Sequence, residues 1–285
     1  MSKGVVLGFL AFALFSISDA CVKSMHGALP PYQICFFGAL FSLTMLPFLW
    51  RRGETVMDLV RARRQWLWIV RGVLSVIGSF SSIIAFSRLP MAEAFALIFL
   101  MPLVTTALSV FFLDEKVTPK AWAAIVLGFI GVLVVLRPGF RTIDIGHIAA
   151  LTCGLCGAVL SVLLRKVGQV EKPVTLFGAG LLFPLIASAG LMIPSYVPPT
   201  ALQWLAIAGF AILAALANVC IMVASRHAPA SWIAPTQYSQ MLWGLGFGWL
   251  FFNDHLDLFT MVGVVIIVAA GLWLFVPKTK KVTAG

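Results

Sequence analysis

The chain has 285 residues, of which 61% are hydrophobic and only 11% charged; its mean hydropathy is +1.04 and its formal net charge is +10. So little polar surface excludes a soluble globular protein and indicates an integral membrane protein. The apolar stretches are continuous and about 20 residues long, which favours helices over barrel strands and leaves no room for a soluble catalytic or nucleic-acid-binding domain.

These stretches predict ten membrane-spanning helices, at residues 4–22, 32–50, 66–87, 92–113, 120–137, 146–164, 173–193, 201–224, 231–252 and 258–276. We expect the first to be retained, because the sequence "SDAC" fits a signal-cleavage site poorly. With the N-terminus inside, 16 of the 20 lysines and arginines fall on the cytoplasmic side, as basic residues prefer. We therefore expect both termini to lie in the cytoplasm, and we expect no nucleic-acid partner.

Short motifs recur at a spacing of 138 to 139 residues. The matched pairs are Ser87-Arg88 with Ser225-Arg226, Asp114-Glu115 with Asn253-Asp254, and Pro138 with Pro277. The chain thus divides into five-span repeats at residues 1–141 and 142–285. Because five is odd, the second repeat must be inverted in the membrane, an arrangement typical of secondary transporters. The sequence predicts an all-α fold of two inverted repeats around a central cavity.

The turn followed by Pro102 in mid-span, then "FFLDEK" and "GFIGVLVVLRP", with a degenerate second copy ending "FFNDH…GLWLFVP", resembles the ten-span EamA-type branch of the drug/metabolite transporter superfamily. Within that branch the chain looks most like a bacterial aromatic amino-acid exporter, which implies a location in the bacterial inner membrane. The resemblance implies alternating access, export of small metabolites, and a cavity among spans 3, 4, 8 and 9 with help from spans 1 and 6. The second copy departs from the pattern at Asn253-Asp254 and at Pro235, which has no counterpart in span 4.

Polar and aromatic residues at helical spacing are the candidates for a cavity lining. Serines can equally serve close helix packing, and an amide within a span can equally bond a neighbouring helix. The predicted substrate-binding residues are Ser79, Ser82, Phe86, Phe95, Thr106, Asn218, Tyr238 and Trp243. A neutral, aromatic-lined cavity suits a neutral or zwitterionic solute with an apolar side chain, such as an aromatic amino acid.

A second set of residues is predicted to gate the cavity. Asp19 and Lys23 lie four residues apart in span 1, a spacing that favours an ion pair. This pair is either an ordinary ion pair at a helix end or a charged rim that meets a zwitterion. Arg88 and Glu93 flank the turn at the same membrane level, so the four charges are expected to meet when the outer mouth closes. Pro102 and Pro235 mark possible bends.

No motif indicates catalysis or a resident metal or cofactor. Cys153 and Cys156 form a CxxC within an apolar span, without the ligands of a zinc site or the turn of a redox site. We expect no obligatory protein partner. A broad-specificity multidrug or metabolite exporter, a membrane enzyme and a channel are the alternatives. Because no carboxylate stands near mid-depth, we expect facilitated or only loosely proton-linked export.

Overall fold

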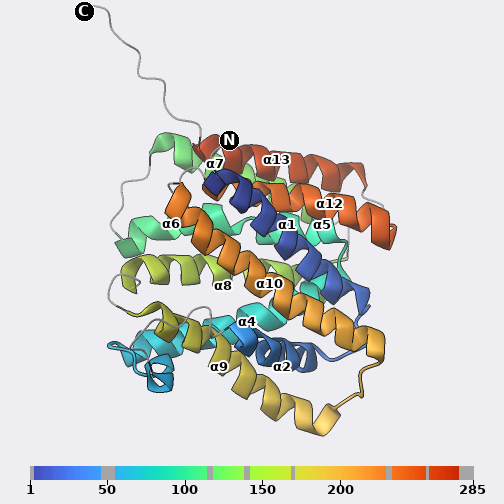
Figure 1. Cartoon of the computed structure of the whole chain (residues 1–285). Coiled ribbons are helices and arrows are strands. Elements are labelled where there is room, and N and C mark those ends of the chain that lie inside the picture. Colours follow the sequence, from blue (N-terminus) through green and yellow to red (C-terminus); the bar gives the residue numbers. More distant parts are fainter. Residues whose placement is uncertain are drawn as a thin grey trace, which may run out of the picture.

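The computed structural model describes residues 3–45, 55–113, 118–137, 142–167, 171–228, 233–254 and 257–275. The described residues form helices joined by short connections (Figure 1). The helices are α1 (Lys3–Ser24), α2 (Pro31–Ser42), α4 (Gln65–Arg88), α5 (Met91–Ile98), α6 (Met101–Leu113), α7 (Pro119–Leu136), α8 (Ile145–Val167), α9 (Pro173–Met192), α10 (Ala201–His227), α12 (Ser239–Phe252) and α13 (Leu258–Phe275). Short 3₁₀ segments are η1 (Leu43–Met45), η2 (Val56–Leu59), η3 (Ile193–Ser195) and η4 (Ala234–Tyr238).

Each of the ten predicted spans contains a described helix, which confirms the all-helical prediction for the described residues. Seven of the described stretches are long and apolar enough to cross a membrane: α1, α4, α5 with α6, α7, α8, α9 and α10. The repeat motifs Asp114-Glu115, Pro138 and Pro277 lie outside the described residues.

Local sequence signals explain where several helices begin. Thr118 caps α7 by accepting the backbone N–H of Ala121 on its hydroxyl, and Pro119 fills the first turn, where its missing N–H is no loss. Thr200 and Gln203 form a capping box at the start of α10.

Three non-glycine residues follow helices in the left-handed conformation: His26 after α1, Arg137 after α7 and Asn253 after α12. Asn253 has φ +53°, and the backbone N–H of Asp254 donates to the carbonyl of Gly248 at 2.9 Å, which ends α12. The turn places Asp254 beside α1. We call this end of the bundle, which holds Lys23, Arg137 and Asp254, the Asp254 end, and the opposite end, which holds residues 58–64 and 171–172, the Arg64 end.

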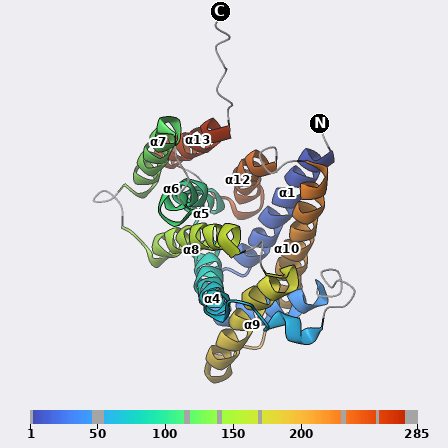
Figure 2. The same cartoon turned by 90° about the vertical axis from the view of Figure 1, so that its left-hand side faces the viewer.

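Helices far apart in the sequence pack in pairs: α1 against α10, α4 against α8, α2 against α9, and α7 against α13. The α7–α13 pair lies at one edge of the bundle and α9 at the other (Figures 1 and 2). At the α7–α13 contact, a Cβ on Gly263 would lie 2.7 Å from the backbone oxygen of Gly131, so only glycine allows the two backbones to come this close.

The fourth predicted span is interrupted. It forms α5 and α6 with a turn at Phe99 and Leu100, and Pro102 lies in the first turn of α6. In the described part of the ninth span no turn intervenes: the 3₁₀ segment η4, which contains Pro235, runs directly into α12. Proline lacks the N–H that a continuous helix needs, so Pro102 accounts for the break in the fourth span.

Candidate functional site

Two adjoining cavities lie among α2, α4, α8, α9 and α10, with volumes of about 230 and 330 Å³. Ser79, Gly180 and Phe210 line both. The first is also lined by Cys35, Gly38, Ala39, Ser42, Arg71, Ile83, Phe177, Leu181 and Pro184, and the second by Ser75, Gly78, Ser82, Cys153, Cys156, Gly157 and Leu160. We call the two together the central cavity. It reaches from mid-bundle toward the Arg64 end.

The polar side of the central cavity comes mainly from one face of α4. Ser75, Ser79 and Ser82 follow each other at helical spacing, and the Ser75 hydroxyl donates to the carbonyl of Arg71 at 2.8 Å. The Ser82 hydroxyl is hydrogen-bonded to the Cys153 thiol. Two of the predicted lining residues, Ser79 and Ser82, are therefore on the cavity wall, and their contact with a substrate stays a prediction. Within the described residues no three His, Cys, Asp or Glu side chains gather as metal ligands.

Three of the predicted aromatic lining residues lie in the hydrophobic core instead. Phe86, Phe95 and Tyr238 are buried, and the rings of Phe86 and Phe95 meet edge to face at 4.9 Å. Phe99 joins this aromatic cluster to Tyr238 at a centroid distance of 5.6 Å. Placing Phe86, Phe95 and Tyr238 on the cavity wall was wrong for this conformation, because their rings contact other aromatic rings in the core instead of a cavity.

The other predicted lining residues also lie away from the central cavity. Thr106 donates to the carbonyl of Pro102 at 2.9 Å, and the exposed Asn218 donates to the carbonyl of Ala214 at 2.8 Å, so both bond within their own helices. Trp243 is exposed and its ring stacks on that of Phe247. None of these three residues lines the two cavities.

The predicted ion pair between Asp19 and Lys23 does not form. Lys23 Nζ instead binds Asp254, at 2.7 and 2.8 Å from the two carboxylate oxygens, and donates to the carbonyl of Leu89 at 3.0 Å. Asp254 Oδ2 also accepts the backbone N–H of Met91 at 3.0 Å. This Lys23–Asp254 lock joins α1, the α4–α5 turn and the end of α12, and its side chains are only 10% and 13% exposed.

Asp19 lies one helical turn deeper than the lock. Its Oδ2 accepts a hydrogen bond from Gln240 Nε2 at 3.2 Å, and the carboxylate interacts electrostatically with the Cys153 thiol on the cavity wall. Asp19 and Lys23 do not pair, although their spacing favours a pair, because Asp19 binds Gln240 and Lys23 binds Asp254.

The expected meeting of Arg88 and Glu93 with these charges is also wrong. Glu93 is buried in the first turn of α5, and its Oε1 lies 2.9 Å from His147 Nε2 in α8. Arg88 is exposed and lies 3.9 Å from Asp144. The Asp254 end is thus held by separate pairs, of which the Lys23–Asp254 and Glu93–His147 pairs are shielded from water.

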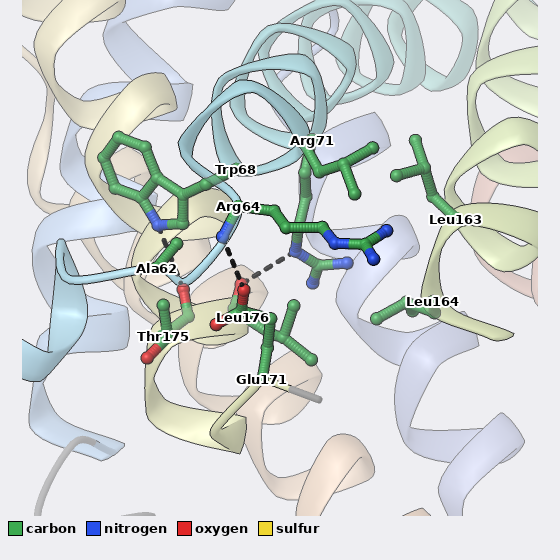
Figure 3. Close-up of a pocket in the computed structure, with 10 residues that line it drawn as sticks. Ala62, Arg64, Trp68, Arg71, Leu163, Leu164, Glu171, Thr175 and Leu176 are labelled. Atoms are coloured by element: carbon green, nitrogen blue, oxygen red, sulfur yellow. Dashed lines mark hydrogen bonds between the residues drawn. The ribbon is translucent and has the colours of Figure 1, made fainter. Parts of the chain in front are cut away.

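The Arg64 end is tied by contacts that sequence reasoning missed. The Glu171 carboxylate accepts the backbone N–H groups of Arg63 and Arg64, at 3.1 and 3.0 Å, and so caps the start of α4 (Figure 3). Trp68 Nε1 donates to the carbonyl of Thr175. No sequence motif predicts this cap, because Glu171 lies more than 100 residues from the helix that it caps.

A surface pair reinforces the same end. Lys172 Nζ donates to Asp58 at 2.8 Å, and the backbone N–H of Thr55 donates to the same carboxylate. Both bonds, that of Lys172 first, hold the pKa of Asp58 below its usual range.

The sequence matches the EamA-like transporter family twice, over residues 2–137 and 144–276. It is 25% identical to the pseudopaline exporter CntI of Pseudomonas aeruginosa (strain UCBPP-PA14), over 99% of this chain and 98% of that protein. It is 22% identical to an S-adenosylmethionine uptake transporter of Rickettsia prowazekii (99% and 95% covered) and 27% identical to a riboflavin transporter of Rhizobium johnstonii (95% and 89%).

A solved crystal structure has the same fold, with a TM-score of 0.64, 21% identity, and coverage of 95% of this chain and 96% of that one. None of these relatives is named for an aromatic amino acid, so that narrower resemblance is not supported. The two family matches span most of the chain, which belongs to the EamA-like transporter family and is a multi-pass membrane transporter, not an enzyme.

Proposed function

We propose that the chain is a secondary transporter that exports a small neutral or zwitterionic metabolite from the cytoplasm by alternating access. The observation that carries the proposal is the central cavity, whose serine-lined wall lies within apolar helices. Polar groups within membrane-spanning helices are costly unless they serve a pathway or a packing contact. Amino acids with aromatic or other apolar side chains are members of this class.

The helix contacts support the inverted repeat. If the repeats are equivalent, α1 of the first corresponds to α8 of the second, and α4 corresponds to α10. The α1–α10 contact then corresponds to the α4–α8 contact, and both are present. Likewise the contact of α12 with α1 corresponds to that of α5 and α6 with α8, whereas α2–α9 and α7–α13 each join equivalent helices. The two family matches divide the chain at the same point. An interrupted helix is a usual mark of a binding site in such repeats, and the fourth span, which forms α5 and α6, has one.

The closed Asp254 end and the position of the cavity support an inward-facing state. With the basic residues of the Arg64 end in the cytoplasm, the Lys23–Asp254 lock lies on the outer side. Substrate would enter the central cavity from the cytoplasm, and opening of the lock would release it outward.

Counterflow into proteoliposomes tests this function, with labelled phenylalanine, S-adenosylmethionine and riboflavin as probes. We expect saturable counterflow of at least one probe, and its loss in Ser79→Phe, which fills the cavity. Ile77→Phe is the matched control, because Ile77 lies on the same helix but is exposed on another face. A flux that does not saturate would indicate a channel, and full activity of Ser79→Phe would mean that the cavity is not the route.

A further inference from the structure

A charged side chain that sequence analysis left outside the site lies on the wall of the central cavity. Arg71, in the second turn of α4, is partly buried and lines the cavity together with Ser79 and Gly180. Its Nε donates to the carbonyl of Leu176 in α9 at 2.8 Å (Figure 3). Among the described residues, the two terminal nitrogens have no hydrogen-bond partner and Arg71 has no carboxylate partner.

The Nε bond fixes the direction of the guanidinium group. A Cβ on Gly180 would lie 3.9 Å from Arg71 Nη2 and 3.8 Å from the Ser75 hydroxyl oxygen, so Nη2 faces the space that the absent side chain leaves open. With Nε engaged, the guanidinium still offers its two terminal nitrogens, which together match the two oxygens of a carboxylate. A lysine would offer a point charge without this geometry.

A carboxyl group lies near the other end of the same cavity. Asp19 is an electrostatic neighbour of Cys153 on the cavity wall, and Cys153 is hydrogen-bonded to Ser82. Gln240 Nε2 donates to one oxygen of Asp19. The cavity therefore has a cationic group at one end, serine hydroxyls along its wall, and a carboxyl group beyond Cys153, outside the lining itself.

The separation of the two ends limits the size of a ligand that could touch both. Arg71 and Ser82 are eleven residues apart on α4, which at the helical rise places their Cα atoms about 16 Å apart. Even after the reach of the arginine side chain is subtracted, an α-amino acid alone, whose ammonium and carboxylate share one carbon, is too short. Ser75 and Ser79 lie along the interval and could bond the body of a longer molecule.

We propose that the central cavity binds an elongated metabolite with its carboxylate on the terminal nitrogens of Arg71 and its cationic end toward Asp19. This inference rests on the proposed transport function and narrows its substrate class. The rival explanation is that Arg71 only anchors α4 to α9 through Leu176. The two differ in whether the charge of Arg71 acts on molecules inside the cavity.

Charge-selective thiol labelling distinguishes them without knowledge of the natural substrate. The five cysteines, all free, are replaced and a single cysteine is placed at Ser79. Its labelling rates are measured with the anionic 2-sulfonatoethyl and the cationic 2-trimethylammonioethyl methanethiosulfonates. We expect Arg71→Gln to lower the anionic-to-cationic rate ratio by about tenfold, since a nearby charge attracts one reagent and repels the other.

Arg64→Gln is the matched control, because Arg64 has the same charge, lies near the same end and has an exposed side chain. Its ratio should equal that of the parent protein. Arg71→Lys retains the charge and should retain most of the ratio, which separates an electrostatic effect from a loosened α4–α9 contact. An unchanged ratio in folded Arg71→Gln, as judged by a monodisperse elution peak, would overturn the inference.

Binding of two probes gives the second test. S-adenosylmethionine carries a carboxylate and riboflavin does not. If the protein binds both, Arg71→Gln should lower the affinity for S-adenosylmethionine by about 10- to 100-fold, the usual loss for a charge-assisted hydrogen bond. The affinity for riboflavin should not change. An equal loss of affinity for both probes would show that Arg71 acts only by holding α4 against α9, and it would overturn the inference. If neither probe is transported, the proposed function fails for these molecules while the labelling ratio still decides the role of Arg71.

Discussion

Replacing Asp254 with asparagine should open the Asp254 end of the bundle. The carboxylate is the shared acceptor for Lys23 Nζ and for the backbone N–H of Met91, so its charge holds α1, the α4–α5 turn and the end of α12 together. Removing one partner of a fully buried ion pair costs about 3 to 5 kcal/mol. Because these side chains keep 10% and 13% exposure, we expect a smaller loss, about 2 to 3 kcal/mol.

If this free energy is lost when the end opens, Asp254→Asn should raise the ratio of open to closed molecules by about 30- to 150-fold. A state that differs from the ground state by a few kcal/mol would then become well populated. The assay is the labelling rate of a single cysteine at Ser82, near the closed end of the cavity, by a membrane-impermeant maleimide added on the Asp254 side. We expect faster labelling in Asp254→Asn.

Asp257→Asn provides the control, since Asp257 also forms a close ion pair, with Arg137 at 2.7 Å, but is 43% exposed and does not touch α1 or the α4–α5 turn in the contacts described. Its labelling rate should stay near that of the wild type. Wild-type labelling of folded Asp254→Asn, or an equal increase in Asp257→Asn, would show that the Lys23–Asp254 pair does not hold this end closed.

Three further changes probe the contacts at the two ends. Glu171→Gln leaves one acceptor for the two N–H groups before α4 and should cost about 1 to 2 kcal/mol, seen as faster amide exchange there than in the wild type. His147→Ala removes one hydrogen-bond partner of the buried Glu93 and should cost about 1 to 3 kcal/mol. His147→Gln, which can still donate, should melt nearer the wild type; equal melting temperatures of the two variants would contradict this. The pKa of Asp58 is lowered in the folded protein, so the stabilisation that its carboxylate gives is complete above its unfolded pKa, near 4, and is lost as the pH falls through the lower folded pKa. Protease cleavage of residues 55–64 should therefore increase over this pH range. Lys172→Met, which lacks the main cause of the lowered pKa, should not show this increase.

The positions of the helices could be predicted because apolar runs end at charges and prolines. The predicted span 66–87 became α4 (Gln65–Arg88) and the predicted span 120–137 became α7 (Pro119–Leu136). Pro102 likewise indicated the interruption of the fourth span. These features depend on residues that are neighbours in the chain, which is what sequence patterns record.

The partners across the bundle could not be predicted in this way. Ser79 and Ser82 of α4 lie on the cavity wall, as their helical spacing predicts. The same reasoning placed Phe86 and Phe95 there as well. Periodicity shows only that a residue faces inward, and does not show whether it meets an open space or a neighbouring ring. Lys23 was assigned to Asp19 by helical spacing, although its partner lies 231 residues away. Arg71 is not among the predicted site residues, and only the position of α9 shows that it reaches the cavity.

The left-handed residues His26, Arg137 and Asn253 each stand where a helix ends at the Asp254 end. A side chain other than glycine is strained in that conformation, so the surrounding contacts must hold each of these residues in place. Lys23 lies within α1, and Asp254 directly follows Asn253 at the end of α12. Breaking the contact between them therefore separates two helices, and we expect this end to open by a tilt of α1 relative to α12.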